Sequence, residues 1–540
     1  MKRNYLLILM LAGAALLTGA AVAFPKIFGI FEWVSMIPLV LVLDRCADNG
    51  DIKKRHCYAY GLLYFEIFYM VCFHFFLYMY PLDFTGLDEV GSVLAIAVAW
   101  LGLPLLQALF GGFVFVIYVS VVRSRLVKRF PIVRIFSLPV IYSFYEFTQT
   151  LGWWGVPWGR LPIGQTELIL PVQTASLFGS YFITFVIVLV NCLILHAAVR
   201  IATDRKAAVR YVAAALAVFI LNIGIGGALY AATRAKEKAA QTVTVGIVQG
   251  NYDSTDKWFA MPSLILNKHL DLTRSCAQDG AQIVIWAETA LPFAFSADGN
   301  ISKSISNTAK ELGITVLVGC MQYTDDGDYN AILCYNPDGT VEDIAYYKRH
   351  LVPFGEYVPM RSVVDVVMPF LSELSMLAED MSAGTEATVF DTDCGKFGSL
   401  ICFDSIYEEL SLDTVRVGAE IFAISTNDSW FSDSAGIHMH NAQARLRSVE
   451  FGRYTARCAN TGLSTVISAT GTVLCDLEPL TEGYLVYDAA LLDGTTLYTV
   501  IGNTFVYVLG ALLLAAPIYA AALDTSALIK KRREECGADE

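Results

Sequence analysis

Gly398-Ser-Leu-Ile-Cys402-Phe-Asp404 is a short apolar run that ends in a cysteine, an aromatic residue and an acid. An apolar run of this length, opened by glycine, is typical of a buried β-strand. It predicts a strand of a soluble α/β domain, with Cys402 at the strand end where a nucleophile can act. Long hydrophobic runs lie on both sides of this domain in the sequence. We therefore expect the substrate of such a nucleophile to lie in a lipid bilayer.

The composition is that of an integral membrane protein. Of the 540 residues, 55% are hydrophobic and only 16% are charged, whereas a soluble chain carries about 25% charged residues. The first apolar stretch also resembles a signal peptide that ends at Ala21-Val-Ala23, and its cleavage would leave the rest of the topology unchanged. Including it, eight stretches approach or exceed the ~20 residues that cross a bilayer, namely about 5–24, 27–43, 58–80, 92–121, 131–149, 172–199, 209–231 and 499–522.

Lysine and arginine predict the orientation of these spans. They gather in every second connection, near residues 2–3, 53–55, 123–129, 200–210 and 530–533. Because positive residues stay on the cytoplasmic side, both termini are expected in the cytoplasm. The sequence thus predicts a seven-helix transmembrane bundle over 1–231, an extracytoplasmic domain over 232–498, and a last transmembrane helix with a cytoplasmic tail over 499–540. The net charge of −13 then falls largely on the outer domain, which argues against nucleic acid as a partner.

Short apolar runs alternate with helical patterns in the outer domain, which predicts a layered α/β fold. Runs that are apolar throughout are typical of sheets covered on both faces. The predicted strands are Val243–Val248, Ile283–Trp286, Thr315–Val318, Ala331–Tyr335, Asp343–Tyr347, Gly398–Ile401, Ile421–Ser425 and Ser464–Ser468. The predicted helices are Leu264–Gln278, Ser302–Leu312, Ile406–Val417 and His438–Arg457.

Three of these segments carry a reactive side chain at a predicted strand end. Glu288 follows Ile283–Trp286, Lys348 follows Tyr347, and Cys402 follows Ile401. Each alone is explained by a surface carboxylate, a solvated ammonium or a buried thiol. Together they fit a base that takes the thiol proton, a cation that stabilises a tetrahedral oxyanion, and a nucleophile.

These segments resemble the nitrilase, or carbon–nitrogen hydrolase, superfamily, and with its spans the whole chain resembles the family of bacterial apolipoprotein N-acyltransferases. The resemblance implies an αββα sandwich in which Glu288 is the general base, Lys348 the transition-state stabiliser and Cys402 the nucleophile. The matching motifs are Ile247-Val-Gln-Gly-Asn251, Trp286-Ala-Glu288, His350-Leu-Val-Pro-Phe-Gly-Glu356, Thr426-Asn-Asp-Ser-Trp-Phe431, Arg445 to Arg453, and Asn460-Thr-Gly462.

The resemblance also implies supporting residues. Glu356 matches a second carboxylate of the family, and Trp258 matches a tryptophan near the acyl site. Phe403 and Asp404 stand where the family usually has Tyr-Glu. The loss of a hydroxyl and a methylene is expected to change how the acyl acceptor is positioned.

The implied reaction moves the sn-1 acyl chain of a membrane glycerophospholipid to Cys402 as a thioester. The chain then passes to the α-amine of an S-diacylglyceryl-cysteine at an apolipoprotein N-terminus. The resemblance implies a monomer of the bacterial cytoplasmic (inner) membrane that works without a metal or a cofactor. His438-Met-His440 is accordingly interpreted as structural, because side chains two apart on a helix diverge.

Two other functions remain open at this point. One is a membrane-bound amide hydrolase of the same superfamily, which would release its acyl group to water. The other is a non-catalytic membrane scaffold or transporter. The apolar stretch 359–381 is either an extra core helix or an amphipathic lid that rests on the bilayer and admits lipid.

Overall fold

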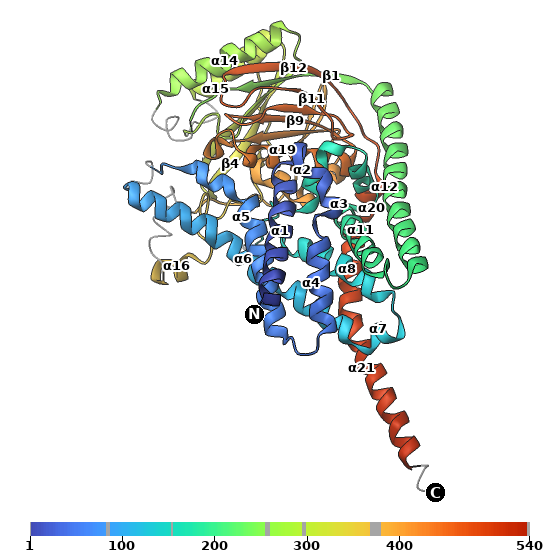
Figure 1. The fold of residues 1–540 in the computed structure, drawn as a ribbon. Helices are drawn as coiled ribbons and strands as arrows, with labels where there is room; N and C mark the ends of the chain where they lie inside the picture. The colour runs from blue at the N-terminus through green and yellow to red at the C-terminus, as the bar shows by residue number, and fades with distance from the viewer. Residues whose placement is uncertain are drawn as a thin grey trace. The chain divides into compact units, whose positions relative to one another are not determined.

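The computed structural model describes residues 2–82, 87–152, 155–253, 260–293, 299–367 and 380–536. The chain forms two compact units (Figure 1). Unit 1 comprises Met1–Phe73, Trp100–Gly227 and Asn503–Glu540, and unit 2 comprises His74–Ala99 and Ala228–Gly502. The domain limits predicted from the sequence stay a prediction.

Unit 1 is helical, and helices α6 and α12 each contribute residues to both units. The longer helices are α1 (Lys2–Ala23), α4 (Ile37–Asp48), α5 (Lys54–Cys72), α6 (Glu89–Arg123), α8 (Val133–Thr148), α11 (Ser180–Arg200), α12 (Arg205–Ala239) and α21 (Thr504–Cys536). Short helical turns join them, namely α2 (Pro25–Phe28), η1 (Gly29–Phe31), α3 (Glu32–Ser35), α7 (Arg125–Arg129), α9 (Leu161–Gly164), η4 (Thr166–Leu168), η5 (Pro171–Thr174) and α10 (Ala175–Phe178).

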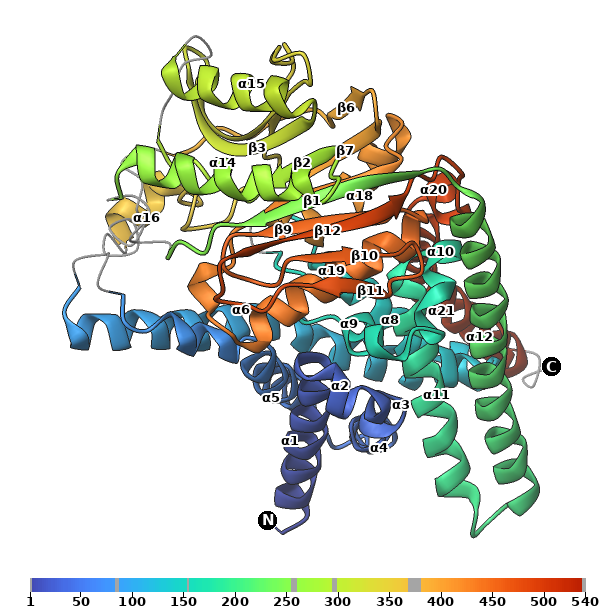
Figure 2. The same cartoon turned by 90° about the horizontal axis from the view of Figure 1, so that it is seen from above.

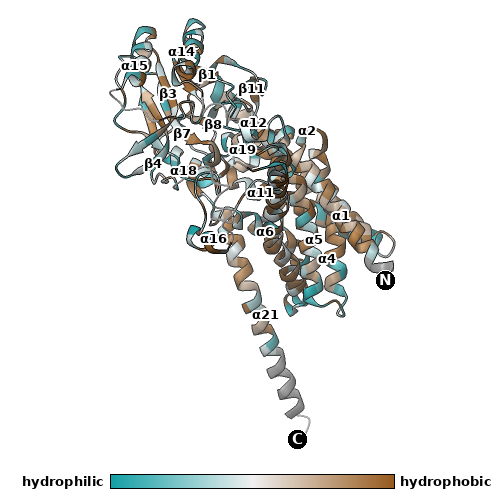
Figure 3. Ribbon diagram, turned by 90° about the vertical axis from the view of Figure 1, so that its left-hand side faces the viewer, coloured by the Kyte–Doolittle hydropathy of each residue, from teal (hydrophilic) through white to brown (hydrophobic). Residues whose placement is uncertain are grey.

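Six helical segments in the described part of the chain are long and apolar enough to cross a membrane (Figure 3). They are Tyr5–Ala23, Pro25–Asp48, Glu89–Arg123, Ser180–Arg200, Arg205–Ala239 and Thr504–Ser526. The two other predicted spans are also helical. However, α8 has only 16 residues, and α5 includes Lys54, Arg55 and Glu66 among its 19.

Unit 2 contains two six-stranded sheets among its described residues (Figure 2). The first sheet has the order β12-β1-β2-β3-β4-β5 and the second β11-β10-β9-β8-β7-β6. Neighbours β1, β2 and β3 run parallel, as do β7, β8 and β9. The strands are β1 (Thr242–Gln249), β2 (Ile283–Trp286), β3 (Thr315–Thr324), β4 (Gly327–Tyr335), β5 (Tyr346–Tyr347), β6 (Val389–Thr392), β7 (Gly395–Ile401), β8 (Ile421–Thr426), β9 (Tyr454–Ala459), β10 (Thr465–Ile467), β11 (Val473–Asp476) and β12 (Gly483–Ala490).

The sheets face each other, and helices cover their outer faces. Side chains such as Ile247, Ile285, Ile401 and Val466 form one buried core between the two sheets. Helices α14 (Pro262–Gln278) and α15 (Asn300–Leu312) pack on the first sheet, while α18 (Glu408–Arg416) and α19 (Ala435–Phe451) pack on the second. This αββα sandwich confirms the predicted fold class. The remaining elements are η2 (His74–Met79), α16 (Arg361–Val367), η6 (Cys402–Ile406), η7 (Ser429–Phe431) and α20 (Leu497–Ile501).

The predicted helix His438–Arg457 was wrong at its C-terminal end. Helix α19 ends at Phe451, because Gly452 adopts a left-handed conformation with φ +63° and turns the chain into β9. Strands β6, β9, β11 and β12 were not predicted. Of the stretch 359–381, residues 368–379 lie outside the described residues, so the lid stays a prediction.

Candidate active site

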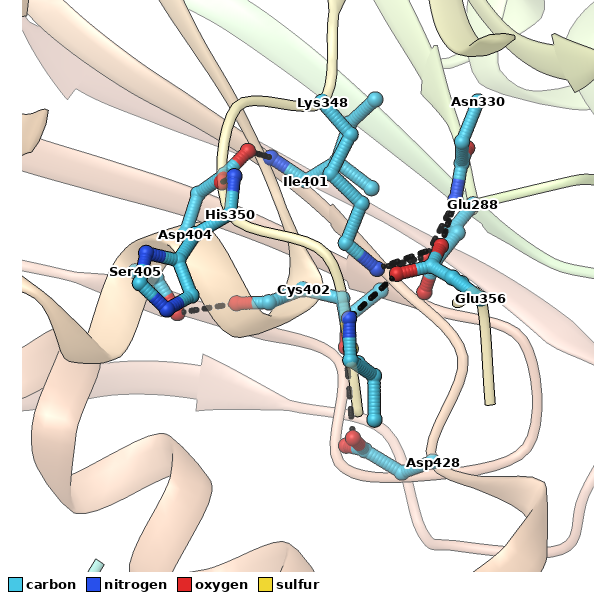
Figure 4. A network of polar contacts seen from close by, with 12 residues as sticks. Glu288, Asn330, Lys348, His350, Glu356, Ile401, Cys402, Asp404, Ser405 and Asp428 are labelled. Atoms are coloured by element: carbon cyan, nitrogen blue, oxygen red, sulfur yellow. Dashed lines mark hydrogen bonds and ion pairs between the residues drawn. The ribbon is translucent and has the colours of Figure 1, made fainter. Parts of the chain in front are cut away.

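The three reactive side chains predicted at strand ends come together in unit 2 (Figure 4). The Lys348 Nζ lies 2.9 Å from an Oε1 of Glu288, which follows β2. It lies at the same distance from an Oε1 of Glu356. The Lys348 side chain is only 1% exposed, so these two carboxylates take the place of water around its ammonium. Glu356, the second carboxylate of the motif, thus contacts Lys348.

Asn330 completes this polar group, and sequence analysis missed it. Its Nδ2 donates to Glu288 Oε1 at 2.7 Å and to Glu356 Oε1 at 2.9 Å. Lys348 and Asn330 therefore both bridge the same pair of carboxylates. The signal in the sequence was an amide that precedes the apolar run Ala331–Tyr335 of β4, where a buried polar side chain needs partners.

Cys402 occupies a strained turn between strand and helix. It follows β7 directly and opens η6, with φ +47°. A non-glycine residue rarely adopts this left-handed conformation, and where it does the surroundings must hold it. The Ser405 Oγ donates to the Cys402 carbonyl oxygen at 2.7 Å. The turn directs the half-buried Cys402 side chain away from the regular pleat of β7.

The charges around Cys402 favour a protonated thiol beside a charged ammonium. Burial raises the pKa of the Cys402 thiol well above its usual range, and Glu288 raises it further, while Lys348 acts to lower it. For Lys348, burial acts to lower the pKa, but Glu288 and Glu356 outweigh it and raise that pKa well above its usual range. The thiol thus needs a base at the moment of attack.

Comparison with known proteins identifies the family. Residues 244–495 match the carbon-nitrogen hydrolase family, and residues 14–193 match the apolipoprotein N-acyltransferase N-terminal domain. The apolipoprotein N-acyltransferase of Geobacter metallireducens is 30% identical over 70% of this chain and 73% of its own. The chain belongs to the apolipoprotein N-acyltransferase family, a family of enzymes.

A second relative agrees with this assignment, and part of the chain is similar to solved structures. The apolipoprotein N-acyltransferase of Gloeobacter violaceus is 27% identical over 91% of this chain and 89% of its own. Among solved structures, Nit3 of Saccharomyces cerevisiae, a member of branch 10 of the nitrilase superfamily, is 21% identical. That match covers 46% of this chain and 90% of the other, with a TM-score of 0.36. The bacterial relatives and the six apolar helices make this member of the apolipoprotein N-acyltransferase family a bacterial membrane protein.

Asp404 links the turn at Cys402 to the segment that carries Lys348. The buried carboxylate accepts from Ile401 N at 3.1 Å and from His350 N and the Tyr346 hydroxyl at 2.7 Å each. Burial raises the pKa of Asp404 to about 6, against the lowering effects of Lys348 and these hydrogen bonds. Asp404, although one methylene shorter than the glutamate usual in the family, therefore accepts three hydrogen bonds.

Phe403 packs against aromatic neighbours rather than solvent. It is buried, and its ring centroid lies 5.4 Å from that of Tyr407 and 5.8 Å from that of His350. Burial and the nearby Lys348 lower the pKa of His350 to about 4, so this imidazole is neutral near pH 7. Trp258, predicted near the acyl site, lies outside the described residues.

Cys402, Asp428 and His440 offer three ligand atoms that lie within 4.8 Å of one another. Their existing contacts do not suit a cation, however. Asp428 already binds the guanidinium of Arg457 at 2.6 Å and the Nδ1 of His440 at 2.8 Å. A metal at this carboxylate would lie beside the buried guanidinium on Oδ2 or would compete with His440 for Oδ1, so it would add a second cation to an acid that is already paired. The donor set therefore does not fit a metal.

Proposed function

We propose that this protein transfers an acyl chain from a membrane glycerophospholipid to the N-terminal amine of S-diacylglyceryl apolipoproteins, through a thioester on Cys402. The observation that carries the proposal is the buried Lys348 ammonium, held by Glu288 and Glu356 next to a strand-end cysteine. Family membership and membrane-length helices support the choice of lipid substrates.

In the first half-reaction, Glu288 takes the Cys402 proton as the sulfur attacks the sn-1 ester carbonyl carbon. The Lys348 ammonium stabilises the oxyanion that forms, since a fixed cation in a buried site needs little reorganisation. The ester C–O bond then breaks. The proton on Glu288 moves to the departing glyceryl oxygen, and a lysophospholipid leaves.

In the second half-reaction, the α-amine of the diacylglyceryl-cysteine attacks the thioester carbonyl carbon. Glu288 takes the proton that the amine loses, and the C–S bond breaks. Glu288 returns this proton to the Cys402 sulfur, which restores the starting enzyme. Water must be kept out during this interval because it would hydrolyse the thioester.

The proposed setting follows from the substrates. Both carry acyl chains anchored in the outer leaflet, so the catalytic part, 232–498, would face the extracytoplasmic side of the cytoplasmic membrane with both termini inside. The proposed enzyme acts as a monomer, with the phospholipid, the apolipoprotein and the bilayer as its only partners and no nucleic acid. Asp404 would orient the Lys348 loop, and Phe403 and Trp258 would border the substrate.

The test is intact-protein mass spectrometry of the detergent-purified chain after incubation with phosphatidylethanolamine. We expect an acyl-sized adduct that hydroxylamine removes and that moves to the amine of an added diacylglyceryl-cysteinyl peptide. The adduct is expected to be lost in Cys402→Ala. It is expected to persist in the matched control Cys475→Ala, since Cys475 lies on β11, at the far edge of the second sheet from β7.

Two other results would contradict the proposal. An adduct that decays equally fast with and without the peptide would make the protein an amide or ester hydrolase of the same superfamily. If no phospholipid gives an adduct on Cys402, the covalent mechanism fails and a membrane scaffold becomes the better interpretation.

A further inference from the structure

A second buried polar group contacts the backbone of Cys402. His440, on α19, places its Nε2 3.1 Å from the Cys402 carbonyl oxygen and 3.2 Å from the Ser405 Oγ. Its Nδ1 lies 2.8 Å from Asp428 Oδ1. None of these contacts involves Glu288, Lys348 or Glu356, so the mechanism above leaves this group without a role.

This group is anchored from two further strands. Asp428, which follows β8, accepts through Oδ2 from the Arg457 Nη2 of β9 at 2.6 Å. The Thr426 Oγ1 donates to Asp428 Oδ1 at 3.2 Å. The side chains of His440, Asp428 and Arg457 are at most 1% exposed. A buried, paired network of this kind keeps one geometry, because breaking any contact leaves a polar group without a partner.

The contact to Cys402 defines what His440 can do. A carbonyl oxygen only accepts hydrogen bonds, so the arrangement in which His440 holds the Cys402 carbonyl is the one with an Nε2–H. The Asp428 carboxylate likewise requires an Nδ1–H. Ser405 supplies a second donor to the same carbonyl. His440 and Ser405 thus hold the peptide unit that follows Cys402, and Cys402 keeps its φ of +47°.

We propose that His440, oriented by Asp428, is a positioning residue that donates to the Cys402 carbonyl and so holds the strained turn that aims the thiol. Without this donor, the turn relaxes toward an ordinary conformation and the sulfur moves away from Glu288 and Lys348. The rate of attack depends steeply on the position of the sulfur, and a displacement of about 1 Å can lower it about 100-fold. This inference rests on the proposed role of Cys402 as the nucleophile.

The experiment compares His440→Leu, His440→Gln and His438→Leu in the full chain in detergent. Single-turnover acylation of Cys402 is followed over a range of phosphatidylethanolamine concentrations. We expect His440→Leu to lower the maximal rate by about 10- to 100-fold, the effect of a lost hydrogen bond, with the half-saturating lipid concentration within about twofold. His440→Gln keeps an amide N–H near the Nε2 position and is expected to recover most of the rate.

His438 is the matched control. It lies two residues earlier on α19, is 44% exposed and contacts Asp433 at 3.5 Å, so His438→Leu should leave the rate unchanged. Ser405→Ala, which removes the other donor to the same carbonyl, should slow acylation by about 3- to 10-fold. If His440→Leu does not fold, Ser405→Ala still tests whether a donor to the Cys402 carbonyl affects the acylation rate.

The failure of this inference differs from failure of the proposed function. The burst of nitrophenolate from p-nitrophenyl octanoate measures acylation of Cys402 without a phospholipid. If the burst is present but phospholipid gives no adduct, the proposed function fails and the burst rates still test His440. A burst and an acylation rate that are unchanged in His440→Leu would overturn the inference. So would His440→Gln if it were as slow as His440→Leu while unfolding at the wild-type temperature.

Discussion

Asn330 donates to both carboxylates that hold Lys348, so its side chain sets the spacing of Glu288 and Glu356. We predict that Asn330→Leu slows acylation of Cys402 by about 100-fold, because two hydrogen bonds to charged groups are lost in a buried site. The measurement is the rate at which the acyl adduct forms with phosphatidylethanolamine.

Asn336→Leu is the control for this prediction. Asn336 donates to Glu342 at 2.8 Å in the turn after β4, away from the Lys348 group. Its replacement should leave the acylation rate within about twofold, because the partners of its Nδ2, Thr340 and Glu342, lie in that turn and not in the Lys348 group. An Asn330→Leu enzyme that keeps a third or more of the wild-type rate would show that Lys348 alone orients the two carboxylates.

Asp404 makes the stability of the protein depend on pH. Burial raises its pKa from 3.8 to about 6 in the folded chain, so the folded state binds this proton more tightly than the unfolded state. The stabilisation is therefore fully present below pH 4 and is lost as the pH rises through 6. We predict that the wild type loses about 3 kcal/mol relative to Asp404→Asn over this window. The measurement is thermal unfolding in detergent at several pH values, and a difference that does not change with pH would contradict it.

Sequence reasoning predicted the three side chains that lie together, and Glu356 beside them, but not Asn330 or the contact of His440 with Cys402. Glu288, Lys348 and Cys402 each follow an apolar run and carry a chemically distinct side chain. Asn330 has only the weak signal of an amide before an apolar run, and His440 has none, because their contacts depend on which strands and helices become neighbours. His440 was interpreted as structural, and only the fold places its ring against the Cys402 carbonyl.

Among the elements, β3 carries a close approach that fixes Glu288. A Cβ added to Gly319 would lie 2.1 Å from the Ala287 carbonyl oxygen and 3.1 Å from the Glu288 Cα. We predict that Gly319→Ala pushes the segment after β2 away and lowers the acylation rate by at least about tenfold, because contacts this short cannot be relaxed locally. The rate of adduct formation on Cys402 is the measurement.

Gly483→Ala is the matched strand variant. Gly483 begins β12, and its added Cβ would meet only the Leu477 Cδ2 at 3.7 Å, an ordinary contact. We expect it to acylate at the wild-type rate. Equal rates for the two alanine variants would mean that the Glu288 segment adapts without moving its carboxylate.

The elements that sequence reasoning found are those with a strong local pattern. The apolar runs of β1, β2, β7 and β8 predicted their strands to within three residues at each end. In contrast, β12 mixes polar and apolar residues. Strand β9 begins soon after α19, and apart from Gly452 the sequence there is compatible with a continued helix. Such strands are defined by pairing with neighbours rather than by their own composition.

At the scale of the whole chain, His74–Ala99 belongs to unit 2, although it includes the end of the predicted span 58–80 and the start of the predicted span 92–121. Phe75 contacts Phe431 at a centroid distance of 4.8 Å, and Gly436 leaves room for the Phe75 ring. Hydropathy could not predict this, because it measures how apolar a segment is and not what that segment contacts.

The positive residues predict which side of the membrane each part faces. We predict that a cysteine replacing Asp338, in the exposed turn after β4, reacts with a membrane-impermeant maleimide on intact cells. A cysteine replacing Asp51, between α4 and α5, should react only after the cells are made permeable. The reverse pattern would place the catalytic part in the cytoplasm and exclude outer-leaflet substrates.

A thiol that keeps its proton is a poor target for peroxide, because oxidants attack the thiolate. The raised pKa of Cys402 therefore protects the resting enzyme from conversion to a sulfenic acid. On the extracytoplasmic side proposed for this domain, no glutathione pool would repair such damage. The same environment that would make the proposed nucleophile depend on Glu288 thus lengthens the time over which each molecule stays usable.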